Sequence, residues 1–473
     1  MSSSAAALLL FLGGAAVAQQ IGTAVPEVHP KLPTQFCTTA GGCKTMQTSL
    51  VTDALSRALH AVGQPSVACD VANKTQCPDA TTCSKNCALE GYDYAAHGVS
   101  TTGNAMTLRL FNGSGTSVQT LSPRVYLLAE DDKNYQLLKL ANQEFTYDVD
   151  MSKVGCGVNG ALYLSEMDAS GGRSAANQAG AQYGTGYCDA QCFNTTFING
   201  LANFNNSGAC CNEMDIWEAN NAATAMTPHT CSDAGLFQCT GDACGRGAAA
   251  VCDKNGCGIN PYRAGAKNFY APGGSVDTSK PFTVVTQFLT SDNATTGSLA
   301  QIRRLYIQNG KMVSSATKSS NGSTTSLSSL ATGFGTITED FCTQNGATDF
   351  VRLGGLQGMG KSLARGMVLI FSIWDAAGDF MTWLDSGEAG PCSATQGDPK
   401  IIAMNNSDAA VTFSNIRWGD IGSTIKMSPN GSIVAATDLA LSKQTSGGAP
   451  LLSMSLSTTI LGGLAMGFGY LLM

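Results

Sequence analysis

The sequence predicts an all-β protein, and two observations support this prediction. Segments in which apolar and polar residues alternate recur along the chain, a pattern typical of strands with one buried face. The chain also contains 54 glycines among its 473 residues, which favours many short strands joined by turns over long helices. We therefore expect an antiparallel sandwich or jelly roll, which offers a ligand groove on a concave sheet face roofed by loops.

The alternation is clearest at residues 145–150, where Phe145, Tyr147 and Val149 share one face of an expected strand. Residues 367–374 are apolar enough for a central strand. The other expected strands are residues 106–111, 124–130, 161–167, 282–288, 302–308 and 411–415. Helix candidates are scarce and comprise residues 53–61 and 361–365.

The two ends of the chain predict targeting signals. Residues 1–18 contain an uncharged apolar run that closes with Ala16-Val17-Ala18, as in a signal peptide. Residues 19–425 are expected to form one domain, followed by a polar stalk at residues 426–450. The uncharged residues 451–473 have the layout of a GPI-anchor signal, and a transmembrane tail is the alternative. We therefore expect a secreted protein or one attached to the outer cell surface by its C-terminus.

The 18 cysteines, an even number, indicate disulfides formed in an oxidising compartment. Zinc is the alternative reading, but the cysteine spacings contain no CxxC pair and the chain has only four histidines. Sequons for N-glycosylation agree with secretion. They lie at Asn73, Asn112, Asn194, Asn205, Asn293, Asn321, Asn405 and Asn430.

The low fraction of charged residues and the negative net charge indicate which kind of molecule the protein binds. Charged residues make up only 13% of the chain, and the net charge is -7. Nucleic-acid binding requires a basic surface that can neutralise phosphates, so this composition argues against a nucleic-acid partner. An uncharged polymer fits the balance better.

One short segment concentrates carboxylates. Residues 210–220 read Cys-Cys-Asn-Glu-Met-Asp-Ile-Trp-Glu-Ala-Asn and contain Glu213, Asp215 and Glu218. On a regular strand Glu213 and Asp215 point to one face, while the apolar Met214 points to the other. Glu218 has the opposite parity, so it can join the other two only through a bulge or a strong twist.

Distance poses a second problem for this segment. A regular strand would separate the Cα atoms of Glu213 and Glu218 by about 16 Å. Retaining glycosidases hold their two carboxyl groups roughly 5–5.5 Å apart. Crowded carboxylates raise at least one pKa, which keeps an acid protonated beside an ionised nucleophile. An exposed acidic strand edge or a calcium site is the alternative for such a cluster.

Residues 355–362 (Gly-Leu-Gln-Gly-Met-Gly-Lys-Ser) match the phosphate-loop pattern. They follow an expected strand at residues 349–353 and lead into the helix candidate at residues 361–365. Nucleotide hydrolysis is therefore a rival function of another class. It requires an alternating α/β fold, and the chain lacks the helices for one.

Six motifs between about residues 36 and 423 form a specific, ordered set. They are Asn-Gly-Ala-Leu-Tyr at 159–163, Tyr-Gly-Thr-Gly-Tyr-Cys-Asp-Ala-Gln-Cys at 183–192, the carboxylate segment at 211–220, Thr-Pro-His at 227–229, Asn-Pro-Tyr at 260–262 and Phe-Ser-Asn-Ile-Arg-Trp-Gly-Asp-Ile-Gly-Ser at 413–423. Through this set the chain resembles glycoside hydrolase family 7. The resemblance implies a β-jelly-roll sandwich of two large antiparallel sheets with a long substrate groove. It also implies retaining hydrolysis of cellulose or a related β-1,4-glucan, with no cofactor and no metal.

By motif position, the resemblance implies that Glu213 is the nucleophile and that Glu218 is the general acid and base. Asp215 would hydrogen-bond the nucleophile, and His229 would line the leaving-group side, a structural histidine being the alternative. The residues that would hold sugar hydroxyls or stack on glucose rings are Asn159, Tyr163, Tyr187, Asp189, Gln191, Trp374 and Trp383.

The resemblance also implies nine disulfides that use every cysteine. The pairs are Cys37–Cys43, Cys69–Cys87, Cys77–Cys83, Cys156–Cys392, Cys188–Cys211, Cys192–Cys210, Cys231–Cys252, Cys239–Cys244 and Cys257–Cys342.

Loop lengths bear on the mode of cleavage. Residues 203–208 and 383–392 are short, as in open-cleft endoglucanases, whereas tunnel-shaped cellobiohydrolases carry longer loops. Ser56 and Ala58 stand where many family members have tryptophans, while the Cys239 to Cys257 segment is similar to that of cellobiohydrolases. We expect a monomeric endo-acting cellulase. A cellobiohydrolase and a catalytically weak glucan-binding or wall-remodelling protein are the alternatives.

Overall fold

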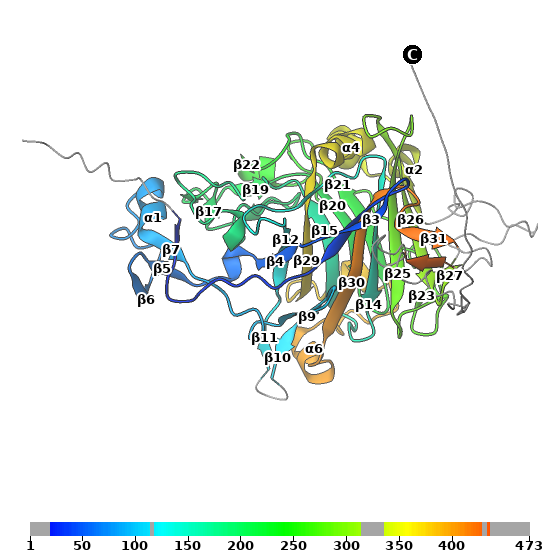
Figure 1. Cartoon of the computed structure of the whole chain (residues 1–473), viewed down its shortest axis with the longest axis horizontal. Coiled ribbons are helices and arrows are strands. Elements are labelled where there is room, and N and C mark those ends of the chain that lie inside the picture. Colours follow the sequence, from blue (N-terminus) through cyan, green and yellow to red (C-terminus); the bar gives the residue numbers. More distant parts are fainter. Residues whose placement is uncertain (1–18, 114–117, 314–334, 428–432, 436–473) are drawn as a thin grey trace, which may run out of the picture.

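Two large β-sheets packed face to face dominate this computed structural model, which describes residues 19–113, 118–313, 335–427 and 433–435 (Figure 1). The first sheet contains, in spatial order, β21 (Thr224–His229), β20 (Glu213–Ala219), β15 (Val158–Ser165), β29 (Met367–Asp375), β12 (Arg124–Leu128) and β4 (Ser49–Thr52), with β13 (Leu137–Leu138) paired to β29. The second contains β27 (Lys311–Val313), β26 (Leu299–Gln308), β25 (Phe282–Thr290), β14 (Gln143–Asp150), β30 (Ala410–Asp420), β2 (Thr34–Thr38) and β3 (Gly42–Met46), with β28 (Thr336–Thr338) on β26, and β9 (Ala105–Arg109) joining β8 (Val99–Thr102) to β30.

In the described residues, every strand pair of these two sheets is antiparallel except β2 with β30, which run parallel. The predicted jelly-roll sandwich is therefore confirmed. The strands expected from alternation or apolar runs also lie within or beside observed ones, because the period-two pattern marks which face of a strand is buried.

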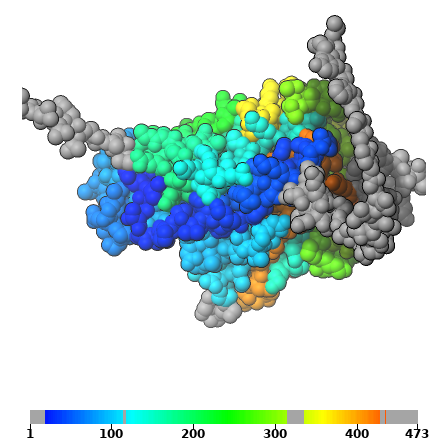
Figure 2. Space-filling model, viewed as in Figure 1, coloured from blue at the N-terminus to red at the C-terminus, as the bar shows by residue number. Residues whose placement is uncertain are grey.

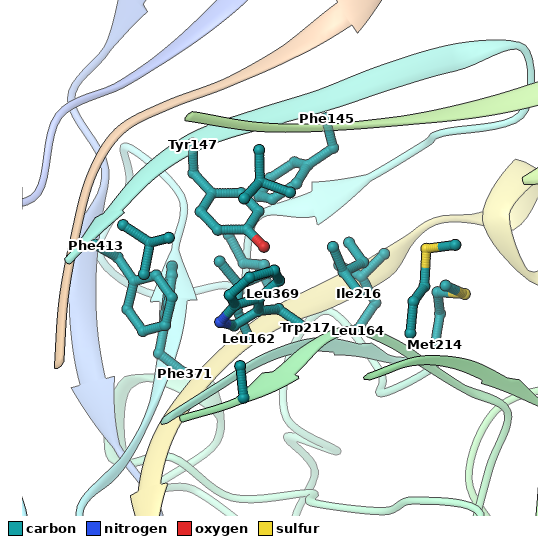
Figure 3. Packing of buried hydrophobic residues seen from close by; sticks show 14 of the residues in the cluster. Phe145, Tyr147, Leu162, Leu164, Met214, Ile216, Trp217, Leu369, Phe371 and Phe413 are labelled. Carbon is teal, nitrogen blue, oxygen red and sulfur yellow. The ribbon is translucent and has the colours of Figure 1, made fainter. Parts of the chain in front are cut away.

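The core lies between the two sheets and follows from this alternation. In β15, Leu162 and Leu164 face the second sheet, whereas Tyr163 packs in a separate cluster on the opposite face. β29 repeats the arrangement with Leu369 and Phe371 in the core. Figure 3 shows the aromatic side chains of the second sheet that pack with them: Phe145, Tyr147 and Phe413. The first sheet thus has one face in the core and one face free to carry a site.

Two local predictions were wrong. Residues 53–61 form only a 3-10 turn at Ala54–Ser56 and then strand β5 (Leu59–Ala61), instead of a helix. Residues 349–353 belong to helix α3 (Thr348–Arg352) instead of a strand. The candidate at 361–365 is the end of a longer helix, α4 (Gly355–Arg365).

Four other short helices in the described part of the chain were not among the predicted elements. They are α1 (Ala80–Asn86), α2 (Glu339–Gln344), α5 (Thr382–Asp385) and α6 (Pro399–Asn405).

A small sheet forms one end of the molecule, at the left of Figure 1. It contains β1 (Gln20–Ile21), β7 (Cys87–Leu89), β5 and β6 (Gln64–Ala68), with α1 beside it. Figure 2 shows the chain after β1, in dark blue, running along the surface from this end toward β2 and β3.

All nine implied disulfides are present, and no cysteine is free, which removes the zinc alternative. Cys156–Cys392 spans 236 residues and ties the start of β15 to the loop after α5. Cys188–Cys211 and Cys192–Cys210 join the segment before β16 (Phe193–Asn194) to the entry of β20. These two disulfides therefore hold the segment that precedes β20.

A further strand pair is described at residues 425–427 and 433–435. β31 (Ile425–Met427) pairs with β32 (Ile433–Ala435), and Ile425 and Ile433 pack in a buried cluster with Val285 of β25. The described residues of the range expected as a polar stalk, 426–427 and 433–435, therefore belong to a strand pair that packs on the second sheet. The predicted signal peptide and C-terminal anchor lie outside the described residues. Within the described ranges, no helix is both long and apolar enough to cross a membrane.

Candidate active site

A one-residue bulge in β20 brings the three carboxylates to one face. Against β21, Asp215 pairs with Thr227 and Glu218 with Ala225, so three steps along β20 match two steps along its neighbour. The pairing with β15 shifts in the same region. The extra residue reverses the parity after Asp215, as a bulge must. Glu213, Asp215 and Glu218 consequently line the same groove.

The residues between the acids anchor the strand from behind. Met214, Ile216 and Trp217 are all completely buried in the core between the sheets, as Figure 3 shows. Successive apolar residues at Ile216 and Trp217 mark the place where the regular alternation is interrupted. The bulge that the parity of the sequence required is therefore present at the expected place.

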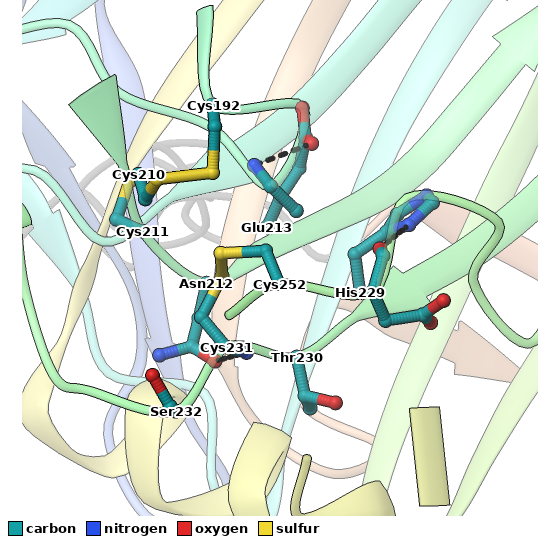
Figure 4. Close-up of a disulfide and its surroundings, with 12 residues drawn as sticks. Cys192, Cys210, Cys211, Asn212, Glu213, His229, Thr230, Cys231, Ser232 and Cys252 are labelled. Atoms are coloured by element: carbon teal, nitrogen blue, oxygen red, sulfur yellow. Dashed lines mark hydrogen bonds between the residues drawn. A yellow bond between two sulfur atoms is a disulfide. The ribbon is translucent and has the colours of Figure 1, made fainter. Parts of the chain in front are cut away.

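Each outer acid has a fixed hydrogen-bond donor. The backbone N–H of Ala190 donates to Glu213 Oε2 at 3.1 Å, and Asn159 Nδ2 donates to Glu218 Oε1 at 3.0 Å. Ala190 lies between Cys188 and Cys192, and Figure 4 shows the Cys192–Cys210 disulfide beside Glu213. The disulfides thus hold the loop whose N–H is directed at Glu213.

Asp215 and His229 form a second pair in the site. His229 Nε2 lies 3.1 Å from Asp215 Oδ2, and His229 Nδ1 lies 2.8 Å from the backbone oxygen of Asp253. His229 stands opposite Glu213 in the β20–β21 ladder. The resemblance implied that Asp215 hydrogen-bonds Glu213; in the described residues Asp215 pairs with His229.

Burial and mutual repulsion set the proton affinities. Burial, followed by the charges of Asp215 and Asp189, raises the pKa of Glu213 well above its usual range. Burial and the charge of Asp215 raise the pKa of Glu218 to about 8, although His229 and Asn159 oppose this shift. At neutral pH Glu218 is therefore mostly protonated, as a general acid must be.

His229 carries positive charge into this cluster. Burial lowers its pKa, but the hydrogen bond and the negative charge of Asp215, together with Asp253, outweigh that effect and raise the pKa to about 9. The imidazolium partly balances the carboxylates. It also favours the ionised form of Glu218, so the two groups are electrostatically linked.

The groove has a volume of about 1070 Å³, which is large enough for several sugar rings. Trp374 and Trp383 line it with ring centroids 6.5 Å apart and planes inclined by 29°. Trp383 is 38% exposed. Flat, partly exposed indole faces of this kind suit the apolar face of a pyranose ring.

The predicted polar residues fall into two groups. Tyr163, Tyr187, Asp189 and Gln191 line the groove, and a hydrogen-bond chain runs from Tyr163 through Tyr187 to Asp189, with oxygen separations of 3.1 and 2.7 Å. Asn159 is fully buried and contacts Glu218 instead of lining the groove. Asn159 therefore orients the acid in this structure.

Several groove residues escaped the sequence analysis because no local motif marks them. Arg124 and Asp53 form an ion pair across β12 and the end of β4, and the guanidinium lies 3.6 Å from the ring centroid of Tyr187. Other residues from separate segments also line the groove: Phe193, Arg246, Asp253, Lys254, Arg263 and Phe341. The fold alone brings these separate segments together.

The phosphate-loop motif has another role. Gly355 to Ser362 lie inside α4, and the backbone N–H of Leu356 donates to the Glu339 carboxylate at 2.9 Å. A negative side chain thus occupies the helix start where a phosphate would bind. Nearly all strand pairs of the two large sheets are antiparallel, so the alternating α/β fold that the rival nucleotide-hydrolysis function requires is not the fold observed.

Comparison with known proteins agrees with this geometry. A family model described as glycosyl hydrolase family 7 matches residues 21–425. The endo-β-1,4-glucanase celB of Aspergillus oryzae is 53% identical over 413 residues, covering 86% of this chain and 96% of that protein. The native endocellulase EGI of Humicola insolens matches with a TM-score of 0.78 at 46% identity, covering 86% of this chain and 100% of the other. A cellobiohydrolase of Daphnia pulex matches with a TM-score of 0.76 but at 35% identity, covering 86% and 100%.

Proposed function

Because the chain belongs to glycosyl hydrolase family 7, we propose that Glu213 and Glu218 cleave its β-1,4-glucan substrate by double displacement. The enzyme is an endo-acting cellulase, since endoglucanases match it at about half identity and a cellobiohydrolase matches less closely. One observation carries the mechanism: the bulge in β20 places both glutamates on the same groove wall.

In the first step, Glu213 attacks the anomeric carbon of a glucosyl unit and forms an ester with it. The glycosidic C–O bond breaks, and Glu218 gives its proton to the departing oxygen. The pKa of about 8 for Glu218 supports this role at neutral pH. Glu213 must be ionised to attack, and the N–H of Ala190 favours that form against the burial and the neighbouring charges that raise the pKa of Glu213.

In the second step, a water molecule attacks the same carbon and passes a proton to Glu218, while Glu213 leaves as a carboxylate. Asp215 raises the proton affinity of both glutamates by its charge. His229 balances that charge from the β21 side. Since Glu218 regains the proton that it gave in the first step and Glu213 leaves as a carboxylate, both glutamates end the cycle in their starting protonation states.

Tyr163, Tyr187, Asp189 and Gln191 would bind sugar hydroxyls along the groove. Asp189 Oδ1 supports this role because it is buried and has no hydrogen-bond partner in the described part of the chain. Such an oxygen gains a partner when a hydroxyl group enters. Trp374 and Trp383 would stack on glucose rings.

The configuration of the first product tests the mechanism. Double displacement inverts the anomeric carbon twice, so NMR spectra recorded within the first minutes on a soluble cello-oligosaccharide should show the β-anomer before mutarotation. An α-anomer as the first product would exclude Glu213 as a nucleophile and require a water between the two carboxyl groups.

The alkaline limb of the pH profile should depend on His229. The His229→Asn variant removes a cation that favours ionised Glu218, so the pKa of Glu218 should rise above about 8. Activity should then persist to higher pH than in the wild type, because Glu218 keeps its proton for longer. The measurement is kcat/KM against pH on a soluble cello-oligosaccharide. A limb displaced toward lower pH would contradict the proposed coupling.

Removing the exposed indole should weaken substrate binding. Trp383→Ala is expected to raise KM for cello-oligosaccharides about fivefold, since stacking contributes about 1 kcal/mol, with a smaller change in kcat. Trp383→Phe, which keeps a flat ring, serves as the matched control and should retain most of the affinity. An unchanged KM in the alanine variant would place the sugar elsewhere in the groove.

We also infer export from the cell. The nine disulfides support this inference because such a framework forms in oxidising compartments. The apolar residues 451–473 would then direct attachment to the outer surface, as a GPI-anchor signal that is replaced by the lipid or as a transmembrane tail. Cell fractionation followed by release with a phosphatidylinositol-specific phospholipase tests the anchor: a lipid anchor is released, whereas a transmembrane tail is retained.

A further inference from the structure

The bulge in β20 leaves Ile216 without a residue opposite it in the ladder with β15 or in the ladder with β21. Its carbonyl oxygen accepts a hydrogen bond from Nη2 of Arg304, which is 88 residues away in β26 of the second sheet. A buried carbonyl without a partner is costly, so this bond stabilises the irregular backbone.

Arg304 occupies a position where the pattern of β26 calls for an apolar residue. Ile302 and Tyr306, two residues before and after it, both lie in the core, and Arg304 is itself only 2% exposed. Nε of Arg304 donates to Thr286 Oγ1 at 3.2 Å. The guanidinium lies 5.4 Å from the ring centroid of Trp217 and 5.9 Å from that of Tyr306.

Burial of an arginine without an acid is unusual, because a buried charge needs compensation. In the described part of the chain, no carboxylate pairs with Arg304; the ion pairs of arginines there involve Arg57, Arg124, Arg352 and Arg365. The two aromatic faces and the carbonyl of Ile216 provide the compensation instead. Arg304 thus joins the two sheets at this point, with Nη2 donating to the bulge and Nε donating to Thr286 of β25.

We propose that Arg304 is a positioning residue for Glu218: it fixes the bulge that brings the general acid onto the face of the nucleophile. Without the extra residue, Glu218 would point into the core with Met214 and Ile216. With a loosened bulge, Glu218 would be held less well relative to the substrate oxygen, and proton transfer is sensitive to displacements of this kind. This inference rests on the proposed role of Glu218.

The test compares two substrates that differ in their need for an acid. A soluble cello-oligosaccharide has a sugar leaving group that must be protonated, whereas dinitrophenyl β-cellobioside has a leaving group that departs without a proton. Arg304→Met, which removes all side-chain donors but keeps an unbranched apolar stem, should lower kcat on the oligosaccharide about 10- to 100-fold. Turnover of the aryl substrate in the presence of azide, which attacks the intermediate without a base, should fall less than about threefold.

Two further variants separate positioning from folding. Arg304→Lys keeps the charge and one donor nitrogen in place of three. Its kcat on the oligosaccharide should fall only about three- to tenfold, again with a smaller loss on the aryl substrate. Arg417→Met is the matched control, because Arg417 is an equally buried arginine that donates to the backbone oxygens of Asn415 and Thr424 in β30 and the segment after it. Its kcat per folded molecule should change little on either substrate.

Glu218→Gln provides the reference for the proposed role. If Glu218→Gln shows the selective loss and the azide rescue while neither Arg304 variant does, the inference about Arg304 is wrong and the role of Glu218 stands. If Glu218→Gln itself loses activity equally on both substrates, the assignment of Glu218 as the general acid fails. Equal losses on both substrates in the Arg304 variants, in proportion to the folded fraction measured by thermal unfolding, would reduce Arg304 to a purely structural residue.

Discussion

Replacing Glu213 by glutamine is expected to lower kcat on soluble cellulose derivatives by about 10⁴-fold or more, because an amide cannot form the glycosyl ester. The fold should be unaffected. Glutamine has nearly the same shape, and its side-chain oxygen can still accept the hydrogen bond from Ala190. The exchange also removes a buried acid that is repelled by Asp215 and Asp189, so the melting temperature should stay equal or rise.

Release of reducing ends and thermal unfolding measure these two effects. Glu144→Gln is a suitable control, since Glu144 is also a fully buried glutamate but lies in β14, where it accepts hydrogen bonds from Gln287 and Thr424. Its kcat per folded molecule should remain close to the wild-type value. Substantial turnover by Glu213→Gln, beyond what residual wild-type enzyme explains, would remove Glu213 as the nucleophile.

The second large effect is expected for Glu218→Gln, which should lower kcat on cello-oligosaccharides by about 10²- to 10⁴-fold. The alkaline limb near pH 8 should disappear from the residual activity, because the group with that pKa is absent. With dinitrophenyl β-cellobioside, the first step needs no acid, so the glycosyl-enzyme should accumulate and its breakdown should limit turnover.

Mass spectrometry of the quenched enzyme detects that intermediate as a cellobiosyl group on the peptide that contains Glu213. Added azide should restore turnover and give β-cellobiosyl azide, since this anion needs no general base. Asn159→Ala tests the role of Glu218 without changing Glu218, because Asn159 donates a hydrogen bond to it. This variant should reduce kcat less than Glu218→Gln does. A Glu218→Gln enzyme with an unchanged pH profile would show that another group supplies the proton.

The fold was predictable from the sequence because alternation marks the buried face of each strand, as in β15 and β29. The site was predictable only in part. The parity of Glu218 predicted that its strand is irregular. The irregular backbone, however, is contacted by Arg304 of β26, which binds the Ile216 carbonyl and lies near the Trp217 ring. No local pattern links β20 with β26, so the sequence alone could not predict that Arg304 contacts the bulge.

The two wrong local predictions have the same cause. Residues 53–61 favour a helix by themselves, yet Leu59–Ala61 pairs with β7, and the disulfide Cys69–Cys87 ties β7 to the segment after β6. Thr348–Arg352 contains the β-branched and aromatic residues of a strand, yet it folds as a helix with Arg352 donating to Asp349 at 3.0 Å. Contacts with other segments override local propensity in both places.

The parallel pairing of β2 with β30 bears on biosynthesis. Gln35 to Cys37 of β2 lie beside Arg417 to Gly419 of β30. One edge of β2, the first strand of the second sheet along the chain, therefore stays uncovered until β30 has been synthesised. During translation, the emerging N-terminal segment therefore remains unpaired on that side until almost the whole domain has left the ribosome, and closure is slow because the ends are so far apart in the chain. A message truncated before codon 410 would yield a product whose second sheet cannot close.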